Sequence, residues 1–321
     1  MNDSTRASGG SIAWALVRLA RPQQWSKSAF VAVGPLYGAA QGATEGRAVG
    51  GVVWAVVLAC ASFALVSSGL YVVNDLLDAE ADRAHPRKRS RPIASGAVGT
   101  NLAIGFAAGL LGVGFALVLA IPTPARWWVL GLVGLHALNV LVYSAKLKHH
   151  AIADVVSLSM GFVLRVLGGC AAVMIEPSTW LLNATFFLSM FLAFGKRLGE
   201  RQSLGEEAAA ARSVQQRYST DLLRMSVVVT AVATLLTYAQ YVLTRDDQYW
   251  VHAPGGQFGM NLLWLTLLPA MYGLMRSLLL LERGVYDDPT ELAARDRPFQ
   301  LAALVFALLT AGLIAIRPGG A

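Results

Sequence analysis

Long apolar stretches separated by short polar segments dominate the hydropathy pattern of the chain. Most of these stretches approach the roughly 20 residues that a helix needs to cross the hydrocarbon core of a bilayer. The pattern therefore predicts an all-α fold, a polytopic membrane bundle of nine transmembrane helices. The nine predicted spans are residues 25–41, 51–73, 101–121, 125–145, 151–175, 179–195, 225–244, 258–281 and 299–316.

The residues before the first span have a different pattern. Arg18 and Arg21 interrupt a short apolar run, so we do not expect a signal peptide here. Residues 11–24 are typical of an amphipathic helix that lies on the membrane surface. We therefore expect an N-terminal interfacial segment, residues 1–24, followed by a nine-span domain, residues 25–321.

The composition excludes several classes of protein. Apolar residues make up 55% of the chain and charged residues 14%, whereas a soluble domain carries roughly 25% charged residues. Disorder requires low hydrophobicity and high charge, so it is excluded as well. Cys60 and Cys170 both lie in apolar stretches, which favours a packing role over a disulfide scaffold.

Lysine and arginine are distributed unevenly between the two predicted sides of the lipid bilayer. With the N-terminus inside, 20 of the 26 basic residues fall on the cytoplasmic side, 4 on the outer side and 2 within spans. This asymmetry follows the positive-inside rule. The net charge of +7 therefore reflects topology, and we expect no nucleic-acid binding. The long charged loops, residues 74–100, 196–224 and 282–298, are predicted to be cytoplasmic, and we expect the active site on that side.

A stripe of polar side chains follows the second predicted span. Asn74, Asp75, Asp78 and Asp82 fall within an arc of about 100° on one helix face, whereas Glu80 points away from it. Three like charges at the end of an apolar helix repel one another and need a counter-charge. Mg²⁺ takes oxygen ligands and is often completed by substrate phosphates, so the stripe is a candidate metal site. The alternative is a solvated helix end whose acids pair with the basic residues that follow.

Five cations in nine residues come directly after this stripe. A phosphate group would explain the combination, because it can bridge a metal ion on one side and guanidinium groups on the other. The five cations are Arg83, Arg87, Lys88, Arg89 and Arg91.

The motif Asn74-Asp75-x-x-Asp78-x-x-x-Asp82, with the basic segment that ends at residues 91–96, resembles the first signature of the UbiA superfamily of intramembrane prenyltransferases. The span count, the inside N-terminus and the positions of the long loops resemble that superfamily over the whole chain. The resemblance implies that this motif binds Mg²⁺ and a diphosphate leaving group. Asp75, Asp78 and Asp82 would then be catalytic residues and metal ligands, and Asn74 a further metal ligand.

The second half of the expected site departs from the superfamily pattern. A second Asp-rich motif is expected after span six, but residues 195–201 hold three cations and one acid. Residues 143–150 are basic too, and Arg165 lies within span five. An intramembrane arginine is a candidate functional residue, although an ion pair or a carbonyl clamp is an alternative. One acidic motif with several cations suits substrates that together carry three or more phosphates.

Several segments resemble one branch of the superfamily, the decaprenyl-phosphate phosphoribosyltransferases. These segments are residues 21–27, 146–148, 162–169, 195–197 and 288–298. The resemblance implies Mg²⁺-dependent transfer of a 5-phosphoribosyl group from 5-phosphoribosyl 1-diphosphate to decaprenyl or another polyprenyl phosphate. The product, decaprenylphosphoryl 5-phosphoribose, would serve cell-wall arabinan synthesis at a bacterial plasma membrane. The resemblance also implies a homo-oligomer. The implied substrate-binding residues are Lys27, Arg83, Arg87, Lys88, Arg91, Tyr143, Lys146, Arg165, Lys196 and Arg197.

Alternatives stay open at this point. A standard prenyltransferase would move a polyprenyl group from its diphosphate to an aromatic acceptor with the same acid stripe, although the missing second acidic motif argues against it. An ion-coupled transporter is disfavoured, because transporters usually place polar residues near the midplane on broken helices. Lys146 and Lys148 are equally explained as membrane anchors, and the acids within 282–298 suit a solvated loop better than a second metal site.

Overall fold

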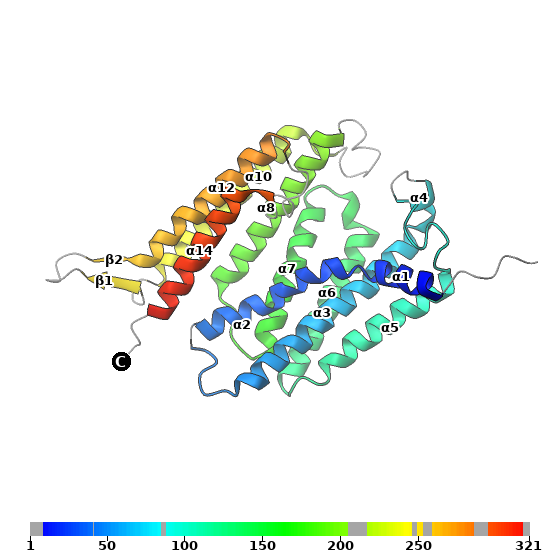
Figure 1. The fold of residues 1–321 in the computed structure, drawn as a ribbon, viewed down its shortest axis with the longest axis horizontal. Coiled ribbons are helices and arrows are strands. Elements are labelled where there is room, and N and C mark those ends of the chain that lie inside the picture. The colour runs from blue at the N-terminus through cyan, green and yellow to red at the C-terminus, as the bar shows by residue number, and fades with distance from the viewer. Residues whose placement is uncertain are drawn as a thin grey trace, which may run out of the picture. The chain divides into compact units, whose positions relative to one another are not determined.

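The computed structural model describes residues 9–40, 42–84, 88–204, 217–245, 249–252, 259–285 and 295–316. Helices account for nearly all of the regular structure (Figure 1). The chain forms two compact units. The first is Met1–Leu147 with Met160–Pro177, and the second is Lys148–Ser159 with Ser178–Ala321.

The first unit has a long central helix, α3, which packs against α5 and α6. Its core contains Phe63 and Val66 from α3, with Val129 and Val133 from α6. The elements that lie wholly in this unit are α1 (Gly9–Ala20), the 3-10 helix η1 (Pro22–Ala29), α2 (Phe30–Ala40), α3 (Val49–Leu77), α4 (Ala79–Ala84), α5 (Thr100–Val118) and α6 (Ala125–Ala145). The unit boundaries fall within the 3-10 helix η2 (Leu147–His149), within α7 (Ala153–Ala172) and between Pro177 and Ser178.

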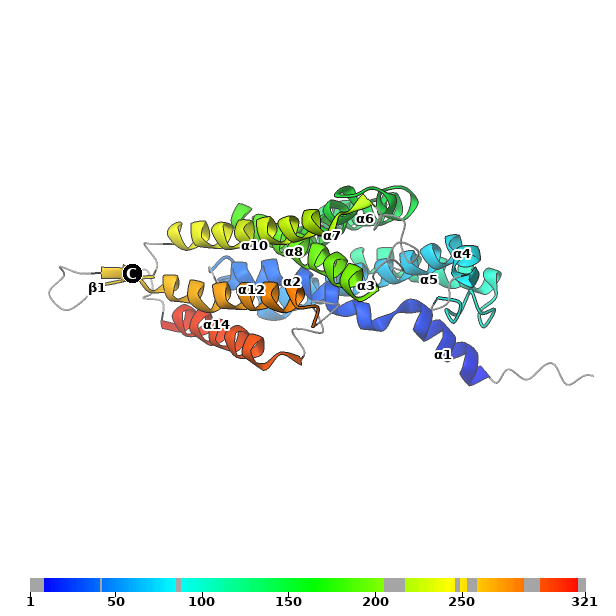
Figure 2. The same ribbon diagram turned by 90° about the horizontal axis from the view of Figure 1, so that it is seen from above.

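In the second unit, α8 packs along α10, and α12 packs against both α10 and α14 (Figure 2). The elements of this unit are α8 (Thr179–Leu204), α10 (Thr220–Leu243), β1 (Trp250–His252), β2 (Gly259–Asn261), the 3-10 helix η4 (Leu262–Thr266), α12 (Leu267–Glu282) and α14 (Arg297–Ile316). The two strands pair antiparallel, with Trp250 opposite Asn261. This small hairpin was not predicted.

The described part of the chain contains eight helices that are long and apolar enough to cross a membrane, so the predicted count of nine is not confirmed. The difference arises at the first predicted span, residues 25–41. There the chain forms η1 and then α2, which has 11 residues and Pro35 in its interior. A helix of that length reaches about 16 Å, roughly half of the hydrocarbon thickness.

The short helix α2 lies against α7 at positions that lack side chains. A Cβ on Gly169 would overlap the carbonyl oxygen of Val31, and a Cβ on Gly34 would overlap the sulfur of Cys170. Small residues let two helix backbones approach closely inside a membrane. The glycines that interrupt the apolar pattern are therefore the packing contacts of α2.

Three further element boundaries differ from the prediction. The interfacial helix ends at Ala20 rather than residue 24, because Arg21 adopts a left-handed conformation with φ 52° and a proline follows it. The span predicted at 258–281 begins with β2 and η4. Helix α8 continues to Leu204, past the predicted end at residue 195, because lysine, arginine and glutamate are good helix formers once the chain leaves the hydrocarbon.

Candidate active site

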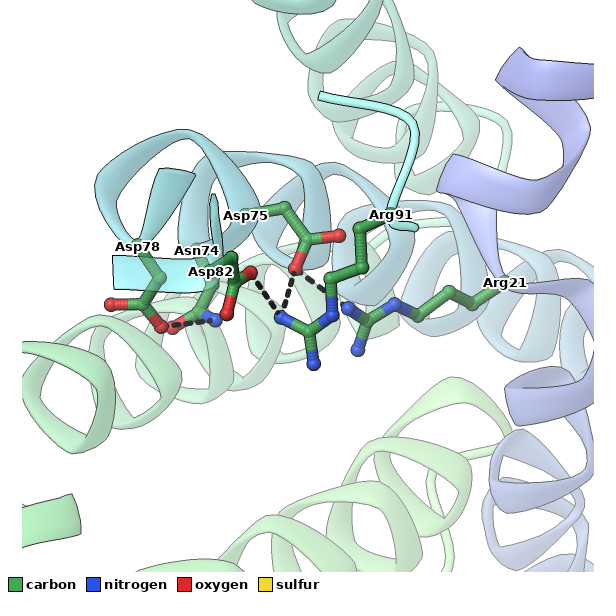
Figure 3. Close-up of polar contacts among 6 residues, drawn as sticks. All are labelled: Arg21, Asn74, Asp75, Asp78, Asp82 and Arg91. Atoms are coloured by element: carbon green, nitrogen blue, oxygen red, sulfur yellow. Dashed lines mark hydrogen bonds and ion pairs between the residues drawn. The ribbon is translucent and has the colours of Figure 1, made fainter. Parts of the chain in front are cut away.

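Four polar side chains form a row across the junction of α3 and α4; we call Asn74, Asp75, Asp78 and Asp82 the acid row (Figure 3). Helical hydrogen bonds run through the junction, from Asp78 N–H to Asn74 O at 2.9 Å and from Asp82 N–H to Asp78 O at 2.8 Å. Asn74 Nδ2 also donates to Asp78 Oδ2 at 3.1 Å. The predicted helix face is therefore kept, and Glu80 is exposed, away from it.

Two arginines neutralise the buried acids of the row. Arg21 Nη2 donates to Asp75 Oδ1 at 2.6 Å. Arg91 Nη1 donates to the same oxygen at 3.0 Å and to Asp82 Oδ2 at 2.7 Å. Figure 3 shows the two guanidinium groups converging on the carboxylate of Asp75. Asp75 and Asp82 are each only 3% exposed, so the two arginines supply the charge-assisted hydrogen bonds that buried carboxylates require.

Arg21 was not among the predicted site residues. Within residues 21–27, only Lys27 was predicted to bind substrate. Its left-handed backbone joins α1 to η1, and its guanidinium lies 5.3 Å from the centre of the Tyr71 ring. A hydrogen bond of 2.9 Å from Trp25 Nε1 to Ser68 Oγ holds η1 on α3. No local periodicity relates residue 21 to the acid row, since their contact depends on how η1 packs on α3.

The basic residues after the acid row have different environments in the structure. Arg83 is exposed on α4, and Lys88 is half-buried. Arg91 forms ion pairs with Asp75 and Asp82. The alternative in which the acids pair with cations that follow them in the sequence therefore holds for Arg91. Arg87 lies outside the described residues.

The second unit contains a buried ion pair that involves another predicted site residue. Arg197 Nε donates to Asp154 Oδ2 at 3.2 Å, and Tyr218 O–H donates to Asp154 Oδ1 at 2.6 Å. All three side chains are buried. Glu200 lies 3.6 Å from Arg197. The guanidinium of Arg197 is therefore engaged within the protein, and its role in phosphate binding stays a prediction.

Tyr218 was not predicted, and it also fixes the chain before α7. Its hydroxyl accepts a hydrogen bond of 2.6 Å from the N–H of Ile152, a residue with φ 69°. Burial first, and then the hydrogen bond to Asp154, raises the pKa of the Tyr218 phenol. The phenol is therefore neutral at physiological pH and acts as a donor to the carboxylate.

The other predicted substrate-binding residues occur in both units. In the first unit, Lys27 is half-buried in η1, Tyr143 is half-buried near the end of α6, and Lys146 is exposed after it. Arg165 is buried in α7, where it donates hydrogen bonds to a carbonyl and a serine. In the second unit, Lys196 is half-buried in α8. Their roles in substrate binding stay predictions.

Comparisons with known proteins decide the family. The model of the UbiA prenyltransferase family matches residues 28–304. The chain belongs to the UbiA prenyltransferase family. Two relatives named decaprenyl-phosphate phosphoribosyltransferase are each 31% identical to it. The protein from Mycolicibacterium smegmatis aligns over 91% of this chain and 89% of its own length, and the one from Mycobacterium tuberculosis over 91% of both.

Solved structures share the UbiA fold. A UbiA homolog from Archaeoglobus fulgidus, bound to DMAPP and Mg²⁺, superposes with a TM-score of 0.64 at 18% identity. The match covers 94% of this chain and 99% of that chain. Together with the eight apolar helices, membership of this family makes the chain a multi-pass membrane protein.

The acid row of this UbiA protein fits the chemistry of Mg²⁺ in its donor atoms. It offers carboxylate and amide oxygens, and its buried acids are already matched by positive charge. Within the described ranges, no group of three or more His, Cys, Asp or Glu side chains is close enough to hold a metal ion by itself. An Mg²⁺ ion at the row would therefore have to take its remaining ligands from water and from phosphate oxygens.

Proposed function

We propose that the chain transfers a 5-phosphoribosyl group from 5-phosphoribosyl 1-diphosphate to decaprenyl phosphate or another polyprenyl phosphate, in an Mg²⁺-dependent reaction. The observation that carries the proposal is the acid row, in which two buried carboxylates meet the guanidinium groups of Arg21 and Arg91. The names of the relatives, which align over nine tenths of the chain, support the choice of substrates.

The charge of the site favours a donor rich in phosphate. A metal–diphosphate complex needs carboxylates on its metal side and cations on its phosphate side. The acid row supplies the first, and Arg21, Arg91 and the half-buried Lys88 supply the second. The segment after span six carries Lys196 and Arg197 where the superfamily pattern has a second Asp-rich motif. In the sequence, one acidic motif with several cations suits substrates that together carry three or more phosphates.

The reaction exchanges one C–O bond for another. The bond between C1 of the ribose and the diphosphate breaks, and a bond forms between C1 and an oxygen of the lipid phosphate. When bound at the acid row, Mg²⁺ would withdraw charge from the diphosphate leaving group. Arg21 and Arg91 would donate hydrogen bonds to the departing diphosphate oxygens as negative charge accumulates on them. The attacking oxygen is already anionic, so the chain needs no strong general base.

The orientation of the site follows from the distribution of basic residues. With the N-terminus in the cytoplasm, the acid row and the segment around Lys196 both face the side where a soluble sugar phosphate is available. We therefore propose a bacterial plasma-membrane enzyme with a cytoplasmic active site. A homo-oligomer stays a prediction from the family resemblance.

Purified protein in detergent tests the proposal directly. It is incubated with Mg²⁺, decaprenyl phosphate and 5-phosphoribosyl 1-diphosphate that carries ¹⁴C in the ribose. We expect radioactivity in the organic phase, lost with EDTA and in Asp78→Asn. Glu80→Gln is the matched control, because Glu80 is an exposed acid next to the row, and it should keep wild-type activity.

Two results would contradict the proposal. Folded protein that leaves all label in the aqueous phase would exclude phosphoribosyl transfer to this lipid. Transfer of a polyprenyl group from a polyprenyl diphosphate to an aromatic acceptor, lost in Asp78→Asn, would instead establish the standard prenyltransferase reaction.

A further inference from the structure

A buried polar cluster surrounds Arg165 in the first unit. Arg165 Nη1 donates to the carbonyl oxygen of Gly161 at 2.9 Å, and Nη2 donates to Ser67 Oγ at 3.0 Å. The Phe162 ring centre lies 5.8 Å from the guanidinium carbon. Arg165 is 5% exposed. Within the described part of the chain, no carboxylate lies within ion-pair distance of it.

The hydrogen bonds continue from Ser67 to a buried histidine. Ser67 Oγ lies 3.1 Å from His136 Nε2. Arg165 Nη2 donates to Ser67 Oγ, and the donor between Ser67 Oγ and His136 Nε2 depends on the tautomer of the imidazole. Neither Arg165 Nε nor His136 Nδ1 has a partner, although both atoms are buried. Arg165 Nε is therefore a buried donor for which the described chain supplies no acceptor, and His136 Nδ1 is a second buried polar atom without a partner.

A glycine lies beside the cluster. A methyl group on Gly161 would lie 3.6 Å from Arg165 Nη1, 3.7 Å from Asn139 Nδ2 and 3.8 Å from His136 Cε1, all at ordinary van der Waals contact. Glycine at this position thus keeps a side chain off these three polar residues.

Charge decides which kind of ligand suits the cluster. A buried cation in hydrocarbon is costly, and hydrogen bonds to one carbonyl and one hydroxyl leave its charge uncompensated. An unpartnered donor such as Arg165 Nε calls for an acceptor, and an uncompensated arginine calls for a negative one. Phosphate oxygens meet both requirements and match the fork of a guanidinium group.

We propose that Arg165, Ser67 and His136, which we call the Arg165 cluster, bind a phosphate monoester of one of the two substrates. The proposal rests on the proposed function, in which both the ribosyl donor and the lipid acceptor carry such a group. Ser67 precedes Asp75 by eight residues on α3, which places the cluster about 12 Å deeper than the acid row along that helix. The Arg165 cluster is thus a second phosphate subsite, separate from the diphosphate site.

Ligand-induced changes in melting temperature distinguish the two sources of the phosphate. The probes are ribose 5-phosphate, for the donor's monoester, and farnesyl phosphate, for the lipid's. We expect one of them to stabilise the wild-type protein, and its apparent affinity to fall by about tenfold or more in Arg165→Gln. His136→Gln should weaken the same probe, and Arg165→Lys should restore part of the binding.

Arg126→Gln is the matched control. Arg126 Nε also donates to a carbonyl, that of Ile121 at 3.0 Å, so it has the clamp role that a purely structural Arg165 would have. Its variant should lower the melting temperature without changing the affinity for either probe. If Arg165→Gln does not fold, Arg165→Lys and His136→Gln carry the test.

The outcomes are separable. Loss of the farnesyl phosphate effect alone assigns the Arg165 cluster to the lipid phosphate, and loss of the ribose 5-phosphate effect alone assigns it to the donor. Unchanged affinities for both probes in folded Arg165→Lys and His136→Gln would overturn the proposal and leave a structural clamp. The binding measurements need no turnover, so they remain informative even if the transfer assay fails and the proposed function is wrong.

Discussion

Replacing Arg197 by alanine tests the buried ion pair of the second unit. The variant removes the cation from Asp154, which is fully buried, and leaves Tyr218 as the remaining donor to that carboxylate. We expect a large loss of stability, because a buried carboxylate without a counter-charge is far more costly than the pair itself.

The structure allows the size of the effect to be worked out. At the observed 3.2 Å, the attraction of two unit charges is about 5 kcal/mol for an effective dielectric constant of about 20. Desolvation of several kcal/mol per ion cancels much of this in the intact pair, but the cost for Asp154 persists when Arg197 is removed. Truncating one partner of a buried pair typically costs about 3–5 kcal/mol, and we expect Arg197→Ala to fall in this range.

Thermal unfolding in detergent measures the loss, with Arg224→Ala as the matched control. Arg224 pairs with Glu282 at 2.8 Å, but their side chains are 47% and 52% exposed, so the control should lose at most about 1 kcal/mol. Adding Asp154→Asn to Arg197→Ala should recover stability, because it removes the stranded charge. Equal losses in the two single variants, or no recovery in the double variant, would refute a buried ion pair at this place.

Three further predictions concern other parts of the molecule. Tyr218→Phe should cost about 1–3 kcal/mol at neutral pH. Folding raises the pKa of this phenol. The extra stability of the wild-type protein over Tyr218→Phe should therefore be complete below pH about 10 and shrink above it. A constant difference in melting temperature from pH 8 to pH 11 would contradict this. Gly169→Ala places a methyl group against the Val31 carbonyl and should cost about 1–3 kcal/mol or more in thermal unfolding, whereas Gly131→Ala, which meets nothing within 4 Å, should be nearly neutral. EDTA should abolish the stabilisation of the protein by 5-phosphoribosyl 1-diphosphate without lowering the melting temperature of the ligand-free protein, and a stabilisation that persists in EDTA would argue against Mg²⁺ at the acid row.

The features that the sequence determined by itself are those set by near neighbours along the chain. Apolar length predicted the helical membrane bundle, and eight of the predicted spans correspond to long apolar helices. The spacing of Asn74, Asp75, Asp78 and Asp82 predicted one face, because helical hydrogen bonds join each residue to the fourth before it. The same motif indicated the UbiA family, which the match over residues 28–304 confirms.

Contacts between distant segments were decided by the tertiary structure. Arg21 reaches Asp75 across 54 positions, and Tyr218 reaches Asp154 across 64. Such pairs depend on how helices pack, which no local periodicity encodes. The first predicted span is not confirmed, because its residues divide between η1 and the short helix α2, whose glycine contacts α7 closely. Sequence identified the acids and Arg91 of the candidate site but not Arg21, and packing determined which of these charges neutralise one another.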